Sequence, residues 1–259
     1  MYQTVTSTQN PRVQALRALH SAKGREAAGC FLAEGAKLCA EALRDAEVAL
    51  LLADQAKAEA FAPLLAAAPE ALLAPAHVLA SACEVKTPQG VVAAVRMPET
   101  MPIEAVESPL LVLDGVQDPG NVGTMLRTAE AAGFKGALLS ANCADPFAPK
   151  TVRASMGSVL RLPFIRGDLP DMLRVLAGRG FALLSAELGG TPFAAAARAL
   201  QHPFALVIGS EGQGVSSEVS AMCGVKVALP MRGRAESLNA AVAAGILMYG
   251  VMGDGETLI

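Results

Sequence analysis

Three segments of the chain gather side chains that are able to do chemistry. In the first, NVGTMLRTA, Asn121 lies at the start of a predicted helix and Arg127 follows six residues later. We expect Asn121 to cap this helix. A helix start together with an arginine favours anion binding, but a capped helix with a surface arginine fits the same residues equally well. From the residues alone both interpretations stay open.

The other two segments are a glycine-rich turn and a basic loop. In IGSEGQG a single acid, Glu211, follows Gly209 and an apolar run. The spacing is neither a dinucleotide-binding GxGxxG nor a phosphate-binding loop, which disfavours an NAD-dependent dehydrogenase; taken alone it fits a tight turn. In LPMRGRAESLNAAVA, Ser237 fits a helix cap. Asn239 stands among small apolar residues, where a buried asparagine needs hydrogen-bond partners.

The elements that must position these segments alternate regularly. Apolar runs predict strands at residues 110–113, 136–139, 162–165, 181–185, 204–208 and 225–229. Helices are predicted at residues 122–132, 169–177, 216–222 and 237–252. Continuous apolar strands that alternate with helices indicate a parallel sheet covered on both faces. Ligands bind beyond the carboxyl ends of such strands, where all three segments lie.

A stretch rich in proline and glutamate, MPETMPIEAVESP, divides the chain. We interpret residues 1–96 as a small α/β domain, residues 97–108 as a linker and residues 109–259 as a larger catalytic domain. In the first domain we predict helices at residues 11–22, 37–43 and 56–68 and strands at residues 31–33, 49–52 and 91–95.

Charge and cysteine usage limit the partners and the compartment. The formal net charge of −3 gives no global basic field that would predict a nucleic-acid partner. Residues 1–40, however, hold five basic and two acidic residues, a net of +3. The five cysteines are scattered and form no Cys/His cluster, and neither a signal peptide nor a membrane span is evident. We therefore expect a reduced, cytoplasmic protein without a metal site or membrane partner.

Taken together, in this order and spacing, the three segments resemble the SpoU (TrmH-like) family of RNA ribose 2′-O-methyltransferases in the SPOUT superfamily. The resemblance covers residues 108–259 and extends more loosely to NPRVQALRAL, Glu34-Gly35 and TPQG at the front. It implies an α/β fold whose C-terminal parallel-sheet domain holds a deep trefoil knot, preceded by a small L30e-like RNA-binding domain. It also implies S-adenosyl-L-methionine as the cofactor, and a homodimer with the active site near its interface.

The resemblance also implies roles for single residues. Arg127 corresponds to the family's catalytic arginine. The other polar residues of the motifs are Asn121, Glu211, Ser237 and Asn239, and the cofactor-contacting positions are Gly209, Leu229 and Leu238. The implied reaction is methyl transfer to a ribose 2′-hydroxyl. A free arginine has too high a pKa to serve as an ordinary base, so we expect Arg127 to orient the phosphate and the hydroxyl.

RNA is therefore the expected partner, and the separate N-terminal domain favours ribosomal RNA over tRNA. A tRNA enzyme of the same family is an alternative, as is a non-catalytic RNA-binding protein, against which the complete motif set argues. We expect phosphate contacts from a basic front face made of Arg12, Arg17, Lys23 and Arg25, although a merely solvated face fits the same charges. A second basic patch is predicted from Arg153, Arg161, Arg232 and Arg234.

Overall fold

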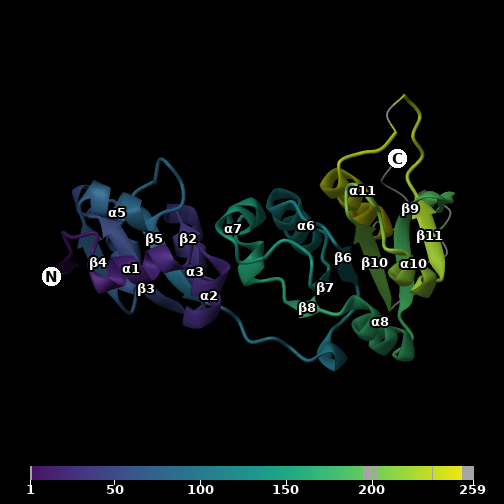
Figure 1. The fold of residues 1–259 in the computed structure, drawn as a ribbon, viewed down its shortest axis with the longest axis horizontal. Coiled ribbons are helices and arrows are strands. Elements are labelled where there is room, and N and C mark those ends of the chain that lie inside the picture. The colour runs from purple at the N-terminus through teal and green to yellow at the C-terminus, as the bar shows by residue number, and fades with distance from the viewer. Residues whose placement is uncertain (1, 195, 197–199, 201–202, 235, 253–259) are drawn as a thin grey trace. The chain divides into compact units, whose positions relative to one another are not determined.

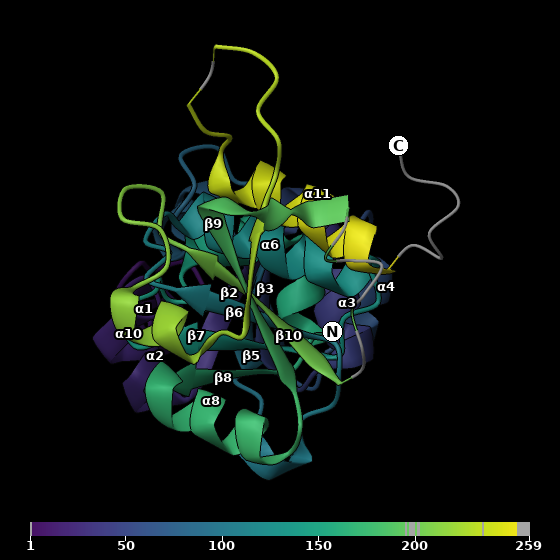
Figure 2. The ribbon, with the colours of Figure 1, turned by 90° about the vertical axis from the view of Figure 1, so that its right-hand side faces the viewer.

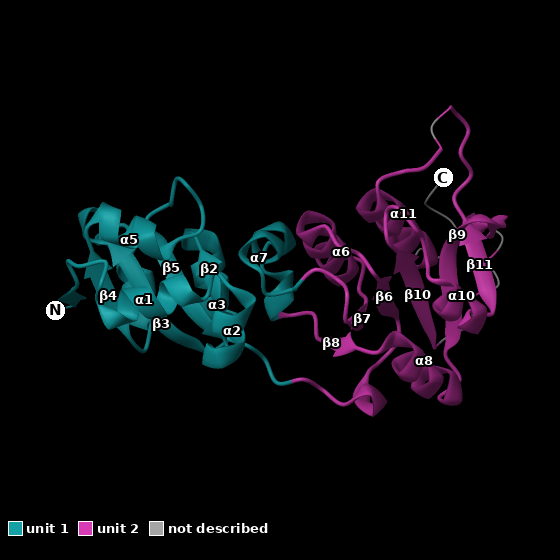
Figure 3. Ribbon diagram, in the orientation of Figure 1, with its two compact units in different colours: residues 1–99, 145–160 teal, residues 100–144, 161–259 magenta. Residues whose placement is uncertain are grey.

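The computed structural model describes residues 2–194, 196, 200, 203–234 and 236–252. It divides into two compact units (Figures 1 and 3). Unit 1 contains Met1–Glu99 and Asp145–Leu160, and unit 2 contains Thr100–Ala144 and Arg161–Ile259. The chain passes from one unit to the other at residue 99, inside the stretch interpreted as a linker. It crosses twice more, because residues 145–160 pack within unit 1 although unit 2 surrounds them in the sequence.

Unit 1 is built on a five-stranded mixed sheet in the order β1-β4-β3-β5-β2. Its strands are β1 (Gln3–Thr4), β2 (Cys30–Glu34), β3 (Val48–Asp54), β4 (Ala71–Ala74) and β5 (Val91–Arg96). β5 is antiparallel to both β2 and β3, whereas β4 is parallel to β3 and β1. Because β2 stands at the end of this order, it is an edge strand, and it depends on another element to cover its open side.

The helices of unit 1 pack on this sheet. They are α1 (Pro11–Ala18), α2 (Ala22–Ala28), α3 (Ala36–Asp45), α4 (Ala62–Ala67), α5 (Ala76–Ala82) and α7 (Pro149–Ser155), with short 3₁₀ turns η1 (Gln55–Lys57) and η3 (Ser158–Leu160). The single helix predicted over residues 11–22 is in fact two, because the Ser21 hydroxyl caps α2 by accepting the N–H of Gly24. The elements β4 and α5 were missed in an Ala- and Pro-rich stretch.

Unit 2 contains the predicted parallel sheet, with six strands in the order β11-β9-β10-β6-β7-β8, all parallel to their neighbours. The strands are β6 (Leu110–Asp114), β7 (Gly136–Ser140), β8 (Phe164–Gly167), β9 (Ala182–Pro192), β10 (Phe204–Gly209) and β11 (Val225–Ala228). The helices are η2 (Ile103–Ala105), α6 (Pro119–Ala131), α8 (Leu169–Gly178), α10 (Ser217–Met222) and α11 (Ala240–Met252).

Two layers of helices cover this sheet. Figure 2 shows α6 and α11 on one face and α8 and α10 on the other. Alternate residues of each strand enter the two cores: Leu111 and Leu113 pack with α6 and α11, whereas Leu110 and Val112 pack with α8 and α10. Burial on both faces is why these strands read as unbroken apolar runs.

One strand runs further than its pattern predicts. β9 continues from the predicted end at residue 185 to Pro192, because its last residues pair with Val227 and Ala228 of β11 after a register shift. Only glycine fits at Gly190, where a Cβ would lie 2.7 Å from the carbonyl carbon of Lys226. None of the helices in the described part of the chain combines the length and the apolar character needed to cross a bilayer.

Candidate active site

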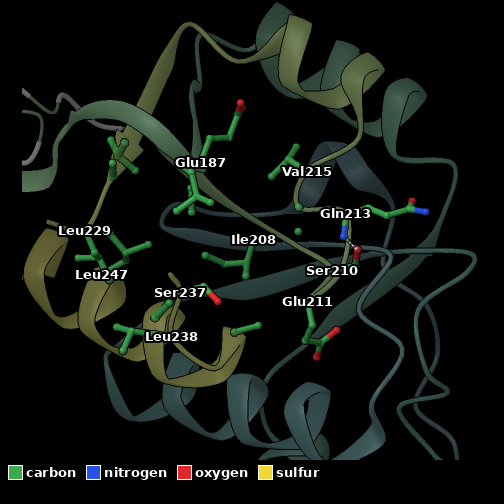
Figure 4. A pocket seen from close by; sticks show the side chains of 18 of the residues that line it. Glu187, Ile208, Ser210, Glu211, Gln213, Val215, Leu229, Ser237, Leu238 and Leu247 are labelled. Atoms are coloured by element: carbon green, nitrogen blue, oxygen red, sulfur yellow. Dashed lines mark hydrogen bonds between the residues drawn. The ribbon is translucent and has the colours of Figure 1, made fainter. Parts of the chain in front are cut away.

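A cavity of about 480 Å³ lies at the carboxyl ends of β9, β10 and β11 (Figure 4). Its walls come from residues 186–188 in the middle of β9, the loop after β10, the loop after β11 and the start of α11. A cavity of this size, at this edge of a parallel sheet, is typical of a small-molecule site, for which volumes of about 300–1,000 Å³ are usual.

The glycine-rich loop after β10 forms one wall by folding back on itself. The backbone groups of Ser210 and Gly214 exchange two hydrogen bonds, of 3.0 and 2.9 Å. A Cβ on Gly209 would lie 2.0 Å from the carbonyl carbon of Gly214, so the loop closes only because residue 209 has no side chain. Gly209, predicted to contact a cofactor, therefore also shapes the loop that lines the cavity.

Apolar side chains form much of the remaining wall. Leu229 and Leu238, the other two predicted cofactor positions, both line the cavity together with Ile208, Val215 and Leu247. Leu238 is 39 % exposed, which leaves apolar surface for a ligand to cover. These side chains suit a flat apolar group such as a purine ring.

Asn121, Glu211 and Asn239, which come from the three separate motif segments, are joined by hydrogen bonds. The Asn121 side-chain amide donates to Glu211 Oε1, and Asn239 Nδ2 donates to Asn121 Oδ1 at 3.2 Å. The prediction that Asn121 caps α6 is wrong: Asp118 is the cap, and its Oδ1 accepts the N–H of Asn121 at 2.9 Å. Since Asn121 lies inside the first turn, its side chain is free to bridge the other two.

Asn239, rather than Ser237, begins the last helix. Its Oδ1 accepts the N–H groups of Ala241 and Val242 at 3.0 and 3.2 Å, so α11 starts three residues later than predicted. Ser237 stands before the helix, exposed, on the cavity wall (Figure 4). No described residue bonds its hydroxyl, which leaves that group available to a ligand.

Arg127 lies on the solvent side of α6 and not among the residues that line the cavity. Val122, Leu126 and Ala129 of the same helix face the core, and the spacing turns Arg127 outward with Thr124. No residue of the described part of the chain bonds its guanidinium. All five donors of this planar fork are thus free for a ligand such as phosphate.

Glu187 is a cavity residue that the sequence reasoning missed. Its carboxylate accepts hydrogen bonds from the Ser185 hydroxyl at 2.6 Å and from Lys226 Nζ at 3.2 Å. Burial raises the pKa of Glu187, but hydrogen bonds from Ser185, Ser220 and Lys226 outweigh it and hold the pKa below its ordinary value. An acid at the carboxyl end of a buried strand, as with Glu211, was the signal that could have found it.

The charges of the cavity wall are all negative. Glu187, Glu211 and Glu236 line it, and no lysine, arginine or histidine does so among the described residues. Such a wall suits a ligand that carries a positive charge. In the described ranges no group of three or more His, Cys, Asp or Glu side chains is arranged to hold a metal ion.

The predicted basic front face is only partly free. Arg17 and Lys23 are exposed, and Arg12 is paired with Glu70 at 2.9 Å. Arg25 is 3 % exposed, and its two terminal nitrogens donate to groups inside unit 1, so the prediction that it contacts RNA phosphates is corrected.

The second predicted basic patch contains two arginines in ion pairs and two exposed arginines. Arg153 and Arg161 form ion pairs with glutamates, whereas Arg232 and Arg234 are exposed on the loop after β11. The five cysteines are buried and free of disulfides. Burial raises the pKa of both Cys39 and Cys83 to about 12, so neither thiol is ionised at neutral pH.

Two family models match the chain. The SpoU rRNA Methylase family matches residues 108–249, and the MRM3-like substrate binding domain matches residues 10–93.

Similar proteins span almost the whole chain. A protein of Synechocystis sp. named as an uncharacterized tRNA/rRNA methyltransferase is 38 % identical, over 95 % of this chain and 92 % of its own. The 23S rRNA (guanosine(2553)-2′-O)-methyltransferase RlmP of Bacillus subtilis is 34 % identical, over 96 % of this chain and 99 % of its own. The crystal structure of an AdoMet-bound rRNA methyltransferase from Sinorhizobium meliloti superimposes with a TM-score of 0.84 at 33 % identity, over 96 % of this chain and 97 % of that one.

Proposed function

The chain belongs to the SpoU rRNA methylase family, and we propose that it transfers the methyl group of S-adenosylmethionine to a ribose 2′-hydroxyl of ribosomal RNA. The observation that carries this proposal is the hydrogen-bonded set of Asn121, Glu211 and Asn239. Two of its members belong to segments that form the cavity wall, and the third lies on the helix of the exposed Arg127.

The cavity fits the cofactor. Leu229 and Leu238 would hold the adenine, and the backbone of the loop that Gly209 begins would bind the polar groups. The carboxylates of the wall suit the positive sulfonium, which supplies an electrophilic methyl group when the cofactor is bound.

A ribose hydroxyl is a weak nucleophile, so these residues would act mainly by orientation. A guanidinium is a donor-only group in proteins, so we do not assign Arg127 the role of a general base. Its free donors would instead bind an RNA phosphate in a forked geometry and so hold the adjacent hydroxyl oxygen. Asn121 would fix the loop by bridging Glu211 and Asn239, and the free Ser237 hydroxyl would contact the substrate.

Unit 1 would bind the RNA. The match of residues 10–93 to a substrate binding domain supports this role, and the exposed Arg17 and Lys23 would contact phosphates. Ribosomal RNA is favoured by the similarity to the Bacillus subtilis enzyme over the full chain. A tRNA substrate is the second candidate, because the name of the Synechocystis relative includes both RNAs.

We further propose that the chain works as a homodimer in the cytoplasm and that its C-terminal part is knotted. An exposed apolar stripe on α11 supports the dimer: Val242, Ile246 and Tyr249 recur at helical spacing and are 53, 39 and 45 % exposed. A second copy of the chain would cover it, and Ile246→Glu should then yield monomers by light scattering. The knot is supported by family membership alone.

The direct test is methyl transfer from labelled S-adenosylmethionine to 23S rRNA and to tRNA, each taken from a strain that lacks the gene. After digestion to nucleosides, the label should appear in a 2′-O-methylated nucleoside of the ribosomal RNA. Label in tRNA alone would show that tRNA is the substrate. Label on a base would contradict methylation of the ribose. Cofactor binding without any transfer to either RNA would favour a non-catalytic binder.

A further inference from the structure

The connection between β7 and β8 is shared between the two units. Residues up to Ala144 pack in unit 2, and Asp145–Leu160 pack in unit 1. Within unit 1, α7 of this connection lies against β2, the edge strand of the five-stranded sheet. The connection thus provides the cover that an edge strand requires. We call residues 140–160 the strap.

The strap enters unit 1 through an ion pair whose arginine is buried. Arg25, whose side chain is 4 % exposed, donates to Asp145 Oδ2 and to the carbonyl oxygens of Leu19 and His20 at 2.9 and 3.0 Å. The other carboxylate oxygen of Asp145 accepts the N–H of Phe147 at 2.8 Å. Asp145 therefore neutralises a buried charge of unit 1 and at the same time shapes the first turn of the strap.

Further along, an aromatic contact and a second ion pair hold the strap. The rings of Phe31 and Phe147 are 4.9 Å apart between centroids. Arg153 Nη2 is 2.7 Å from Glu84 Oε2, and its Nη1 is 4.0 Å from Glu34 Oε2. Glu34 is fixed in turn, because its carboxylate accepts the backbone N–H of Glu84 at 2.7 Å.

The first part of the strap holds the loop between β6 and α6 in unit 2. Ser140 Oγ accepts the N–H of Gly115 at 2.8 Å, and the N–H of Ala144 donates to the carbonyl of Val116 at 2.9 Å. Cys143 Sγ lies 3.3 Å from the carbonyl oxygen of Leu113. This loop leads directly to Asn121, so successive residues of one segment support the motif loop and bind unit 1.

We propose that the strap couples RNA binding by unit 1 to the cofactor site of unit 2, with Asp145 and Arg153 as positioning residues. The inference rests on the proposed function, because it takes unit 1 as the RNA-binding part. Such coupling is reciprocal: RNA on unit 1 changes the affinity for cofactor by the same factor by which cofactor changes the affinity for RNA.

Two variants weaken the docking of the strap by different chemistry. Arg153→Met removes the charge but keeps an apolar stem, and Phe147→Leu removes the ring contact. Arg174→Met is the matched control, because it breaks an exposed ion pair with Asp171 on α8, an element that is not part of the strap. The melting profile of each variant is first compared with that of the wild type. If one strap variant unfolds, the other strap variant is used alone.

The first measurement is the Kd of S-adenosylhomocysteine, which avoids turnover, with and without 23S rRNA from the deletion strain. We expect RNA to change this Kd by about fivefold or more in the wild type. In both strap variants the Kd without RNA should match the wild type, while the effect of RNA falls below about twofold. Arg174→Met should keep the full effect. A full effect of RNA in the strap variants would overturn the coupling.

The second measurement needs no RNA. Hydrogen–deuterium exchange should show that S-adenosylhomocysteine slows exchange in residues 145–160 of the wild type, but not in Arg153→Met. If S-adenosylhomocysteine leaves the exchange of residues 145–160 unchanged in the wild type, the proposed coupling is refuted even if methyl transfer is observed. Slowed exchange together with absence of RNA binding would instead refute only the proposed substrate.

Discussion

The arginine that is buried in unit 1 is held by an ion pair, whereas an exposed arginine and an exposed serine of unit 2 have no hydrogen-bond partner among the described residues. Arg25 gives its donors to two carbonyls and to Asp145. Arg127 and Ser237 are exposed, and no described residue bonds either of them. The same side-chain type therefore stabilises the fold in one unit and is available to a ligand in the other.

The apolar side chains show the same contrast. In unit 1 the large apolar side chains of the sheet, such as Leu32 and Leu52, are almost fully buried. In unit 2 Leu238 lines a cavity while 39 % exposed, and the outer face of α11 is apolar. Exposed apolar surface costs free energy in water, and the exposed apolar side chains of the cavity and of α11 are therefore the surfaces for which we propose a ligand and a second copy of the chain.

The largest effect on the free energy of unfolding should come from breaking the ion pair between Arg25 and Asp145. Asp145→Ala leaves the buried guanidinium of Arg25 without its counter-charge, which costs about 3–5 kcal/mol of unfolding free energy. Asp171→Ala, which breaks an exposed pair, should cost less than about 1 kcal/mol. Denaturant unfolding measures both, and equal costs would contradict the contrast between paired and free groups.

The next effect concerns the cavity wall. Gly209→Ala places a Cβ against the backbone of Gly214, so the loop must shift and the Kd of S-adenosylmethionine should rise about tenfold or more. At Gly178, which does not line the cavity, no atom lies within 4 Å of the Cβ position, so Gly178→Ala serves as the control and should bind within about twofold of the wild type. Equal affinities of the two variants would show that the close approach at Gly209 does not shape the site.

Asn239 both caps α11 and donates a hydrogen bond to Asn121, and two substitutions separate these roles. Asn239→Ala removes the cap of α11, at about 1 kcal/mol, and the donor to Asn121. Asn239→Asp keeps the cap but cannot donate. Turnover should fall in both variants, and the melting temperature should fall in Asn239→Ala only. If Asn239→Asp keeps full turnover, the residue acts only as a cap.

The smallest effect is a pH dependence at Glu187. Because its folded pKa lies below the ordinary value of 4.5, the ionised carboxylate adds stability above about pH 4.5. That stability is lost as the pH falls through the lowered pKa. Glu187→Gln should flatten this part of the stability curve by at most about 1 kcal/mol, measured by thermal melts from pH 7 to 3. An unchanged slope would mean that the hydrogen bonds from Ser185 and Lys226 do not hold the carboxylate ionised.

The parallel sheet of unit 2 was predictable because strands buried on both faces leave continuous apolar runs such as residues 110–113. The helix starts were not, because Asn121 and Ser237 are as good caps as Asp118 and Asn239, and only the folded backbone selects between them. The roles of the site residues stay predictions, although Gly209, Leu229 and Leu238 share one cavity.

Contacts between distant parts of the sequence could not be predicted from the local sequence pattern. The burial of Arg25 depends on Asp145, 120 residues away, and no local signal announces such a pair. The same holds for the packing of residues 145–160 in unit 1, because their own pattern, a short helix that begins at the second of two prolines, does not show which sheet they cover. Glu187, in contrast, lies just after a predicted strand, so its place at the site could have been predicted from the sequence.

The most direct test of the central claim is to measure cofactor binding and methyl transfer together in Arg127→Ala. Arg127 lies outside the cavity lining, so the Kd of S-adenosylmethionine by calorimetry should stay within about twofold of the wild type. Single-turnover methyl transfer to ribosomal RNA should fall by a factor on the order of 10²–10³. Full transfer by Arg127→Ala would contradict the assignment of this exposed arginine of α6 as the group that orients the RNA.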